Sequence, residues 1–197
     1  MVGNIDPDDL TAFIRAQFDF LGEHGFEFDS TWSGVVRWRC EDRFVIVAHD
    51  WRDGLTEVGF RRGTDRAWTD YFSLEQAAEV LDAPAWPRHG WHAMSDADAR
   101  LHVTELAGFL ATHADALLVP GSRAWTQVAE LARRRSEAYT VEVVSRPFLT
   151  RAEEAWRGKS WLDVIAAYEA AIDAGATLRP SEVRRLDYAR GQRNSAP

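Results

Sequence analysis

Three histidines near the middle of the chain have side chains that could bind a metal ion. His89 and His92 are separated by two residues, and His102 follows after the acidic residues Asp96 and Asp98. Imidazole and carboxylate groups are common ligands of zinc and other divalent ions. The spacing of His89 and His92, however, does not match the histidine pair of the helical H-E-x-x-H zinc motif, which is four residues apart. We therefore expect surface histidines in a loop and no bound cofactor, and keep a metal site as the alternative.

Asp50 and Glu57 are the second candidates for chemistry. If Asp53-Gly54 forms a two-residue hairpin turn, paired residues have numbers that sum to 107, and these two carboxylates lie opposite each other. Two close carboxylates can perform acid–base chemistry when they are buried. Arg52 and Arg61 share their face and could compensate the two negative charges. We therefore expect a solvated charge network, with a hydrolytic site as the alternative.

The segment Arg157-Gly158-Lys159-Ser160 ends like a phosphate-binding P-loop. The full motif requires a glycine five residues before Gly158, where the chain has Glu153, and also a preceding strand. We interpret Gly158 as a helix end and Ser160 as the start of the next helix. The sequence also lacks G-x-S-x-G, H-E-x-x-H, G-x-G-x-x-G and C-x-x-C motifs. We therefore predict no catalytic residue.

The elements that would position these residues begin with a helix and an antiparallel sheet. Asp6 can cap a helix that starts at Pro7. Three strands are expected at about 34–40, 43–51 and 55–62, with a fourth near 67–72. A turn at Glu41-Asp42 would pair residues whose numbers sum to 83. Both turns place the same apolar set on one face, which should pack against helices: Val36, Trp38, Cys40, Val45, Val47, Trp51, Val58 and Phe60.

The rest of the chain predicts mainly helices. Ser73, Ser95 and Ser122 are capping residues that would start three of them. Thr150 and Ser160 would start the two helices of a single tetratricopeptide-like hairpin, too few for a repeat array. Residues 136–149 fit either a strand or a helix.

The fold class that follows is α+β. We predict an α+β module at 1–83, a linker or ordered loop at 84–95 and a helical module at 96–197. The middle segment is assigned from its prolines and glycine.

Composition excludes several classes of protein. With 46% hydrophobic residues the chain can bury a core, and no apolar run reaches the roughly 18 residues that span a bilayer. We therefore expect no membrane partner. The single cysteine, Cys40, excludes an internal disulfide. The first residues lack the basic and apolar segments of a signal peptide, which predicts a cytoplasmic protein.

The formal net charge of −8 is uneven along the chain. Residues 1–100 carry a net charge of −9 and residues 101–197 a net charge of +1. An acidic first half repels the phosphates of nucleic acids, so we expect no nucleic-acid partner. The same charge fits a basic protein partner better, although solubility alone is the interpretation that we favour.

Two segments carry a resemblance to known proteins. Phe18–Phe26 followed by Val45–Gly54 resembles the start of many small uncharacterised bacterial proteins, and Leu106–Leu118 has a similar pattern. Several of those proteins are similar to immunity proteins of polymorphic-toxin systems. The resemblance implies neutralisation of a toxin by binding, without catalytic residues.

The leading expectation is therefore a non-catalytic cytoplasmic binding protein that occludes a partner. Trp32 or Trp51 would anchor the partner, and Asp50, Asp53 and Glu57 would form an acidic rim. One alternative is a metal-dependent or hydrolytic enzyme that uses the His89–His102 stretch or the Asp50/Glu57 pair. A third possibility is a self-associating scaffold whose arginine-rich sheet face covers another subunit.

Overall fold

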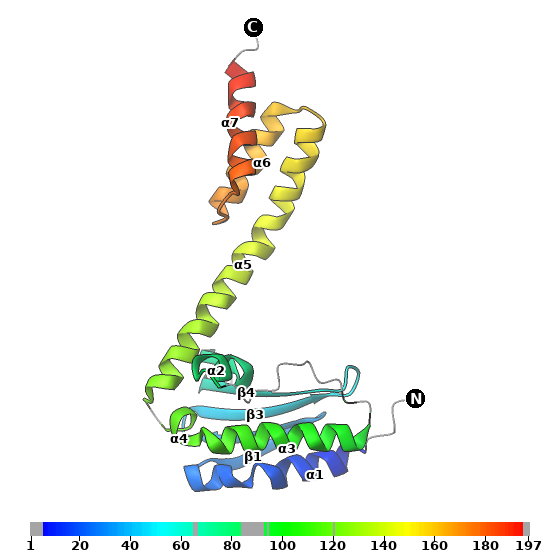
Figure 1. Cartoon of the computed structure of the whole chain (residues 1–197), viewed down its shortest axis with the longest axis vertical. Coiled ribbons are helices and arrows are strands. Elements are labelled where there is room, and N and C mark those ends of the chain that lie inside the picture. Colours follow the sequence, from blue (N-terminus) through cyan, green and yellow to red (C-terminus); the bar gives the residue numbers. More distant parts are fainter. Residues whose placement is uncertain (1–5, 65–66, 84–92, 94, 120, 195–197) are drawn as a thin grey trace. The chain divides into compact units, whose positions relative to one another are not determined.

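A computed structural model of the chain describes residues 6–64, 67–83, 93, 95–119 and 121–194. They form two compact units, Met1–Arg133, here the sheet unit, and Arg134–Pro197, here the helical unit (Figure 1). The buried side chains of the first core lie between Leu10 and Ala132, and those of the second between Ala152 and Ala189. The two cores share no residue. The division therefore falls at Arg133/Arg134 and differs from the predicted linker at 84–95.

The sheet unit begins with a helix that the preceding residue caps. Helix α1 (Pro7–Gln17) starts after Asp6, whose carboxylate accepts a hydrogen bond from the Asp8 N–H at 2.9 Å. The short 3-10 helix η1 (Asp19–His24) follows and ends at Gly25, which has a left-handed φ of 79°. These two segments and the residue between them bury Leu10, Ile14, Phe18 and Leu21.

Five antiparallel strands follow in chain order, and the predicted α+β fold is confirmed. They are β1 (Glu27–Trp32), β2 (Val35–Cys40), β3 (Arg43–Asp50), β4 (Leu55–Thr64) and β5 (Ala67–Ser73). The prediction of three to four strands missed β1. This edge strand exposes most of its side chains on both faces, so no buried alternation marks it in the sequence.

The β2–β3 hairpin has the predicted register. Cys40 pairs with Arg43 and Val36 with Val47, so paired numbers sum to 83. The two-residue turn places Glu41 at a φ of 55°, although neither turn residue is a glycine.

The β3–β4 hairpin has a different register from the predicted one. Asp50 pairs with Leu55, so paired numbers sum to 105, and Glu57 lies opposite Ala48. The turn spans four residues, and the Gly54 N–H donates to the Asp50 carbonyl at 2.7 Å. The predicted Asp50/Glu57 pair is therefore wrong. The predicted apolar face is unchanged, because a register shift of two residues leaves each side chain on the same side of the sheet.

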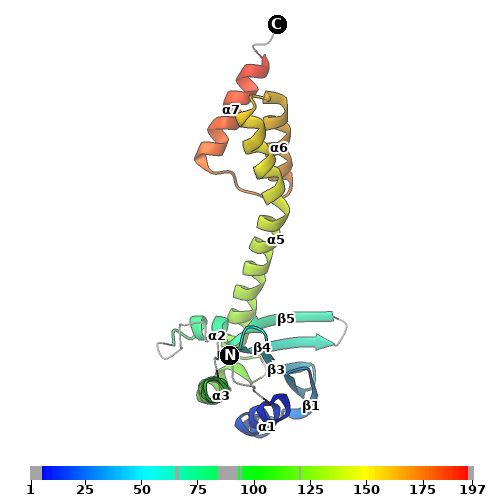
Figure 2. The same ribbon diagram turned by 90° about the vertical axis from the view of Figure 1, so that its right-hand side faces the viewer.

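Helices cover the inner face of the sheet, which carries Val36, Val45, Val47, Val58 and Phe60. Helix α3 (Asp96–Thr112) lies beside α1 on this face (Figure 2). Helices α2 (Leu74–Val80) and α4 (Ala114–Leu117) contribute buried residues to the same core. Because α3 buries its apolar side against the sheet, residues 96–112 belong to the sheet unit and not to a separate helical module.

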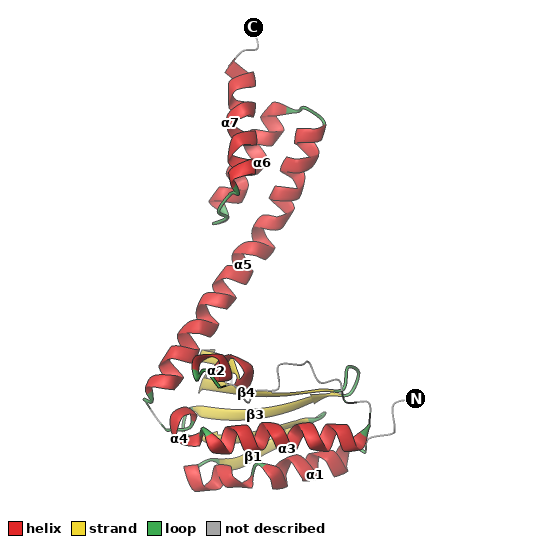
Figure 3. Cartoon of the chain, in the orientation of Figure 1, coloured by secondary structure: helices red, strands yellow, loops and turns green. Residues whose placement is uncertain are grey.

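The helical unit is built from three helices (Figure 3). Helix α5 (Arg123–Arg157) begins in the sheet unit and continues into the helical unit, where α6 (Trp161–Asp173) and α7 (Pro180–Asn194) follow. The ambiguous segment 136–149 is helical, and α5 continues through Pro147 and the predicted start at Thr150. The predicted hairpin thus gains a third helix. Among the described residues, no helix combines the length and apolar character needed to cross a bilayer.

Candidate functional site

The predicted partner-binding residues lie at or near one face of the sheet. Trp32 pairs with Val35, Val35 with Ala48 and Ala48 with Glu57, so all four occupy one row across the sheet. Trp32 is 48% exposed at the β1 edge, and Glu57 is also exposed. The row therefore separates Trp32 from Glu57 by two intervening strands, and the two do not form a cluster.

Trp51, one of the two predicted anchors, packs against residues of its own unit. It is half-buried, and its ring meets the His49 ring edge-on with centroids 4.5 Å apart. A Cβ at Gly34 would lie 2.5 Å from the Trp51 Nε1, so the indole packs directly against that glycine. Much of the indole surface is thus used inside the sheet unit.

The Asp50 carboxylate bonds to the backbone of its own turn. The Asp50 carboxylate accepts hydrogen bonds from the backbone N–H groups of Arg52 at 2.8 Å and Asp53 at 3.4 Å. These two bonds lower the pKa of Asp50. Asp53 is exposed. With Glu57 opposite Ala48, the residues of this turn do not form the carboxylate pair that a hydrolytic mechanism would need.

The predicted metal ligands are not brought together within the described part of the chain. His89 and His92 lie outside the described residues, and His102 is 5% exposed on α3. Burial and the nearby His49 ring lower the pKa of His102, and burial lowers that of His49, against a smaller effect of Asp50. Among the described residues, no three His, Cys, Asp or Glu side chains could hold a metal ion.

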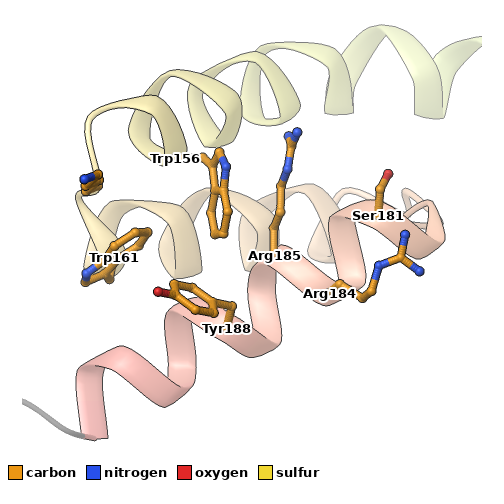
Figure 4. Close-up of a pocket in the computed structure, with 7 residues that line it drawn as sticks. Trp156, Trp161, Ser181, Arg184, Arg185 and Tyr188 are labelled. Carbon is orange, nitrogen blue, oxygen red and sulfur yellow. The ribbon is translucent and has the colours of Figure 1, made fainter.

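The strongest candidate site is an aromatic–cationic pocket within the helical unit. Its cavity of about 560 Å³ is lined by Trp156, Lys159, Trp161, Ser181, Arg184, Arg185 and Tyr188. Figure 4 shows Trp156 and Arg185 in the middle, Trp161 and Tyr188 at one end, and Ser181 and Arg184 at the other. The residues come from the end of α5, the start of α6 and one face of α7.

Three aromatic rings from three helices form the apolar part of this pocket. Each pair among Trp156, Trp161 and Tyr188 has centroids 5.5 Å apart in an edge-to-face arrangement. Such contacts fix ring orientations because each ring edge meets another ring's face. Tyr188 is nonetheless 50% exposed. The cluster therefore offers a preformed apolar surface to a ligand.

A tight turn between α5 and α6 holds the only lysine of the sequence beside these rings. The Ser160 N–H donates to the Ala155 carbonyl at 2.9 Å, and the Lys159 N–H donates to the Trp156 carbonyl at 3.1 Å. Lys159 has a left-handed φ of 55°, a conformation that favours glycine. The two bonds form a Schellman motif, a common helix end, and Lys159 lines the pocket beside the rings.

Positive charge lies on the rim of the pocket. The Arg185 guanidinium lies 5.5 Å from the Trp156 ring centroid, and Arg184 and Lys159 are exposed. Ser181 stands in the first turn of α7, where the helix dipole adds partial positive charge. The residues described around the cavity include no carboxylate. The arrangement is suited to an anionic group next to a large apolar group.

Sequence reasoning missed this site because its residues come from three helices whose packing it could not predict. Two signals were present. One is the unique Lys159 between two tryptophans, and the other is the spacing of residues 181, 184, 185 and 188, which is one face of a helix.

Comparisons of the chain with protein-family models, with curated proteins and with solved structures found no match.

Proposed function

We propose that this chain is a non-catalytic binding protein whose helical unit recognises an acidic segment of a protein partner. The observation that carries the proposal is the aromatic–cationic pocket, which combines three aromatic rings with three cationic side chains. A large apolar side chain of the partner contacts the rings. Its flanking carboxylates pair with Lys159, Arg184 and Arg185.

The charge of the pocket decides between two ligand classes. Clustered aromatic rings alone often bind quaternary ammonium groups. Here, three cationic side chains would repel such a ligand, and the described lining residues include no carboxylate. The nearby glutamates Glu142, Glu153 and Glu182 line a neighbouring pocket that shares only Arg185 with this one. An anion gains from each of these groups, so the anionic ligand is favoured.

The pocket also lacks the groups of a catalytic site. Among the described lining residues, Ser181 is the only hydroxyl other than the Tyr188 phenol, and residues 134–197 contain no histidine. Activation of a serine nucleophile requires an adjacent base. Binding without catalysis is therefore the function that these side chains support.

The length of the pocket favours an extended segment over a small metabolite. Residues 181 and 188 of α7 are seven residues apart, which corresponds to about 10 Å along the helix axis. That distance spans about three residues of an extended chain. With Trp161 and Tyr188 at one end and Arg184 at the other, the pocket matches a segment in which an aromatic residue stands next to carboxylates.

The test is a titration of the full-length chain with a labelled peptide, acetyl-Glu-Glu-Phe-Glu-Glu-amide, followed by fluorescence anisotropy. We expect saturable binding that weakens with salt. The analogues Gln-Gln-Phe-Gln-Gln and Glu-Glu-Ala-Glu-Glu should each bind about tenfold or more weakly, because each lacks one half of the recognised chemistry.

A matched pair of charge reversals locates the site. Arg184→Glu should weaken binding by about tenfold or more, whereas Arg193→Glu makes the same change on α7 at a residue outside the pocket lining. Equal affinities of the two variants would contradict the proposal. Tighter binding of a single-stranded oligonucleotide than of the peptide would replace the protein segment with a nucleic acid.

Neutralisation of a toxin is the biological role that the sequence resemblance implies for such a binder. A gene for a toxin immediately upstream would support that role, and a metabolic operon would argue against it. The basic partner predicted for the acidic sheet unit stays a separate prediction, since the pocket of the helical unit selects the opposite charge.

A further inference from the structure

The face of the sheet opposite to α1 and α3, here the outer face, carries apolar residues that lie outside the hydrophobic core of its unit. Val36, Val45 and Val47 on the inner face belong to that core, whereas Val35, Phe44, Ile46 and Ala48 on the outer face belong to neither core. Phe44 is buried under the guanidinium groups of Arg37 and Arg39, and the other three are part-buried. At Gly59, the three atoms nearest to an added Cβ belong to Tyr71, Phe72 and Ile46, which are all residues of the sheet. An apolar sheet face of this kind normally packs against another layer.

Charge on the outer face is polarised along the strands. On β4, Glu57 and Arg61 lie on this face at equal distances from Gly59, one on each side. Asp50, opposite Leu55, adds to the acidic end. At the other end, Arg39, whose guanidinium lies 5.6 Å from the Phe44 ring centroid, is paired with Glu27 of β1. The separation of charge is therefore clearest on β4, which is acidic at Glu57 and basic at Arg61.

We propose that the outer face binds a second copy of this chain about a two-fold axis that crosses the strands at the row Arg37, Ile46 and Gly59. This rotation brings Glu57 of each copy to Arg61 of the other. A two-fold axis parallel to the strands would instead place the acidic ends together. The charge pattern therefore selects one axis.

The other rows are compatible with this axis. On β3, Ala48 and Phe44 lie at equal distances from Ile46, so the rotation places a small side chain against a large one. Arg37 on the axis meets Arg37 of the other copy, but its charge is already balanced. Its Nη2 lies 2.5 Å from the Asp29 carboxylate within the same chain. The charges on β4 are thus self-complementary, which favours a second copy over an unrelated protein.

The experiment measures self-association of the full-length chain by sedimentation equilibrium over a wide range of concentration. We expect a dimer that dissociates as salt is raised. Glu57→Arg or Arg61→Glu alone creates two like-charge contacts in each dimer, so each variant should associate at least about a hundredfold more weakly. Circular dichroism checks that each variant is folded.

An equimolar mixture of the two single variants gives the decisive result. The Glu57→Arg copy carries arginine at both positions and the Arg61→Glu copy carries glutamate at both. Every charged contact in a mixed dimer therefore joins opposite charges, and association should return to near the wild-type level. A wild-type chain that stays monomeric at every concentration overturns the proposal, and so does a mixture of two folded variants that fails to associate. This outcome is independent of peptide binding by the helical unit.

Discussion

The two units of this chain differ in charge, titratable groups and architecture. Residues 1–133 carry 12 basic and 22 acidic side chains and all six histidines. Residues 134–197 carry 11 basic and 9 acidic side chains, the only lysine and no histidine. The first unit builds a sheet with one covered face, and the second builds three helices around a pocket. The proposed anion recognition and the expected sensitivity to mild acid are therefore assigned to different parts of the molecule.

Truncation of a core residue in each unit should produce the largest effects and test whether the units are separate. Phe60→Ala removes a fully buried ring of the sheet unit, and Tyr168→Ala removes a ring that is 1% exposed in the helical unit. Each should cost about 3–5 kcal/mol in the free energy of unfolding. Hydrogen exchange should report lost protection in the altered unit alone, because the cores share no residue. Loss of protection throughout the chain would show a single cooperative unit.

Mild acid should destabilise only the sheet unit. Burial lowers the folded-state pKa of both His49 and His102 below the ordinary value of 6.5. As pH falls below about 6.5, the unfolded chain takes up protons that the folded unit does not accept. The free energy of unfolding is therefore fully retained above this pH and decreases as pH falls toward the folded pKa values. Unit-resolved hydrogen exchange from about pH 7.5 to pH 5.5 measures this slope.

Substitutions test whether His49 and His102 cause this dependence of the free energy of unfolding on pH. His49→Gln should flatten it by removing one buried imidazole, which in wild type is 3% exposed and shares a hydrogen bond of 2.8 Å between its Nδ1 and the Thr56 hydroxyl. His24→Gln, on η1, is the matched control. An equal slope in the helical unit would contradict the comparison.

Helix caps should differ between the units although the sequence predicts both. In the sheet unit, the Ser73 hydroxyl accepts a hydrogen bond from the Gln76 N–H at 3.2 Å, and the Gln76 side chain accepts one from the Ser73 N–H at 2.9 Å. Ser73→Ala should cost about 1 kcal/mol. The Ser160 side chain makes no cap hydrogen bond to the backbone of α6. Ser160→Ala should therefore change stability by less than about 0.5 kcal/mol in chemical denaturation.

Lys159→Gly should change the stability of the helical unit in the opposite direction. Glycine relieves the left-handed backbone and should stabilise the helical unit by up to about 1 kcal/mol, while loss of the charge weakens peptide binding. Lys159→Ala should weaken binding without the gain in stability. Glu41→Gly is the matched change in the sheet unit, where φ is also 55°. It should leave peptide affinity unchanged, and a parallel loss of affinity would contradict the assignment of the site.

Local sequence signals predicted the elements whose contacts are close in the chain. The two-residue turn at Glu41-Asp42 set the β2–β3 register, and Asp6, Ser73 and Ser95 cap helices as expected. The predicted β3–β4 register differs from the observed one by two residues. The Asp50 carboxylate stabilises a longer turn than Asp53-Gly54 alone indicates. A side chain that bonds to its own turn is difficult to infer from spacing.

Long-range packing decided the features that the sequence did not predict. The capping pattern at Thr150 indicated the start of a helix, yet α5 continues through it and through Pro147. Residues 96–112 were assigned to a separate module because periodicity shows that a helix has an apolar side but not what covers it. The pocket was missed for the same reason, since Trp156, Trp161 and Tyr188 meet only after α5, α6 and α7 have packed.

The measurement that tests the central claim most directly is hydrogen exchange of the full-length chain with and without the Glu-Glu-Phe-Glu-Glu peptide. The account predicts increased protection at residues 156–161 and 181–188, which contribute the aromatic–cationic pocket, and no change at residues 35–61 of the sheet. Protection confined to the sheet unit, or no change at a saturating peptide concentration, would contradict it.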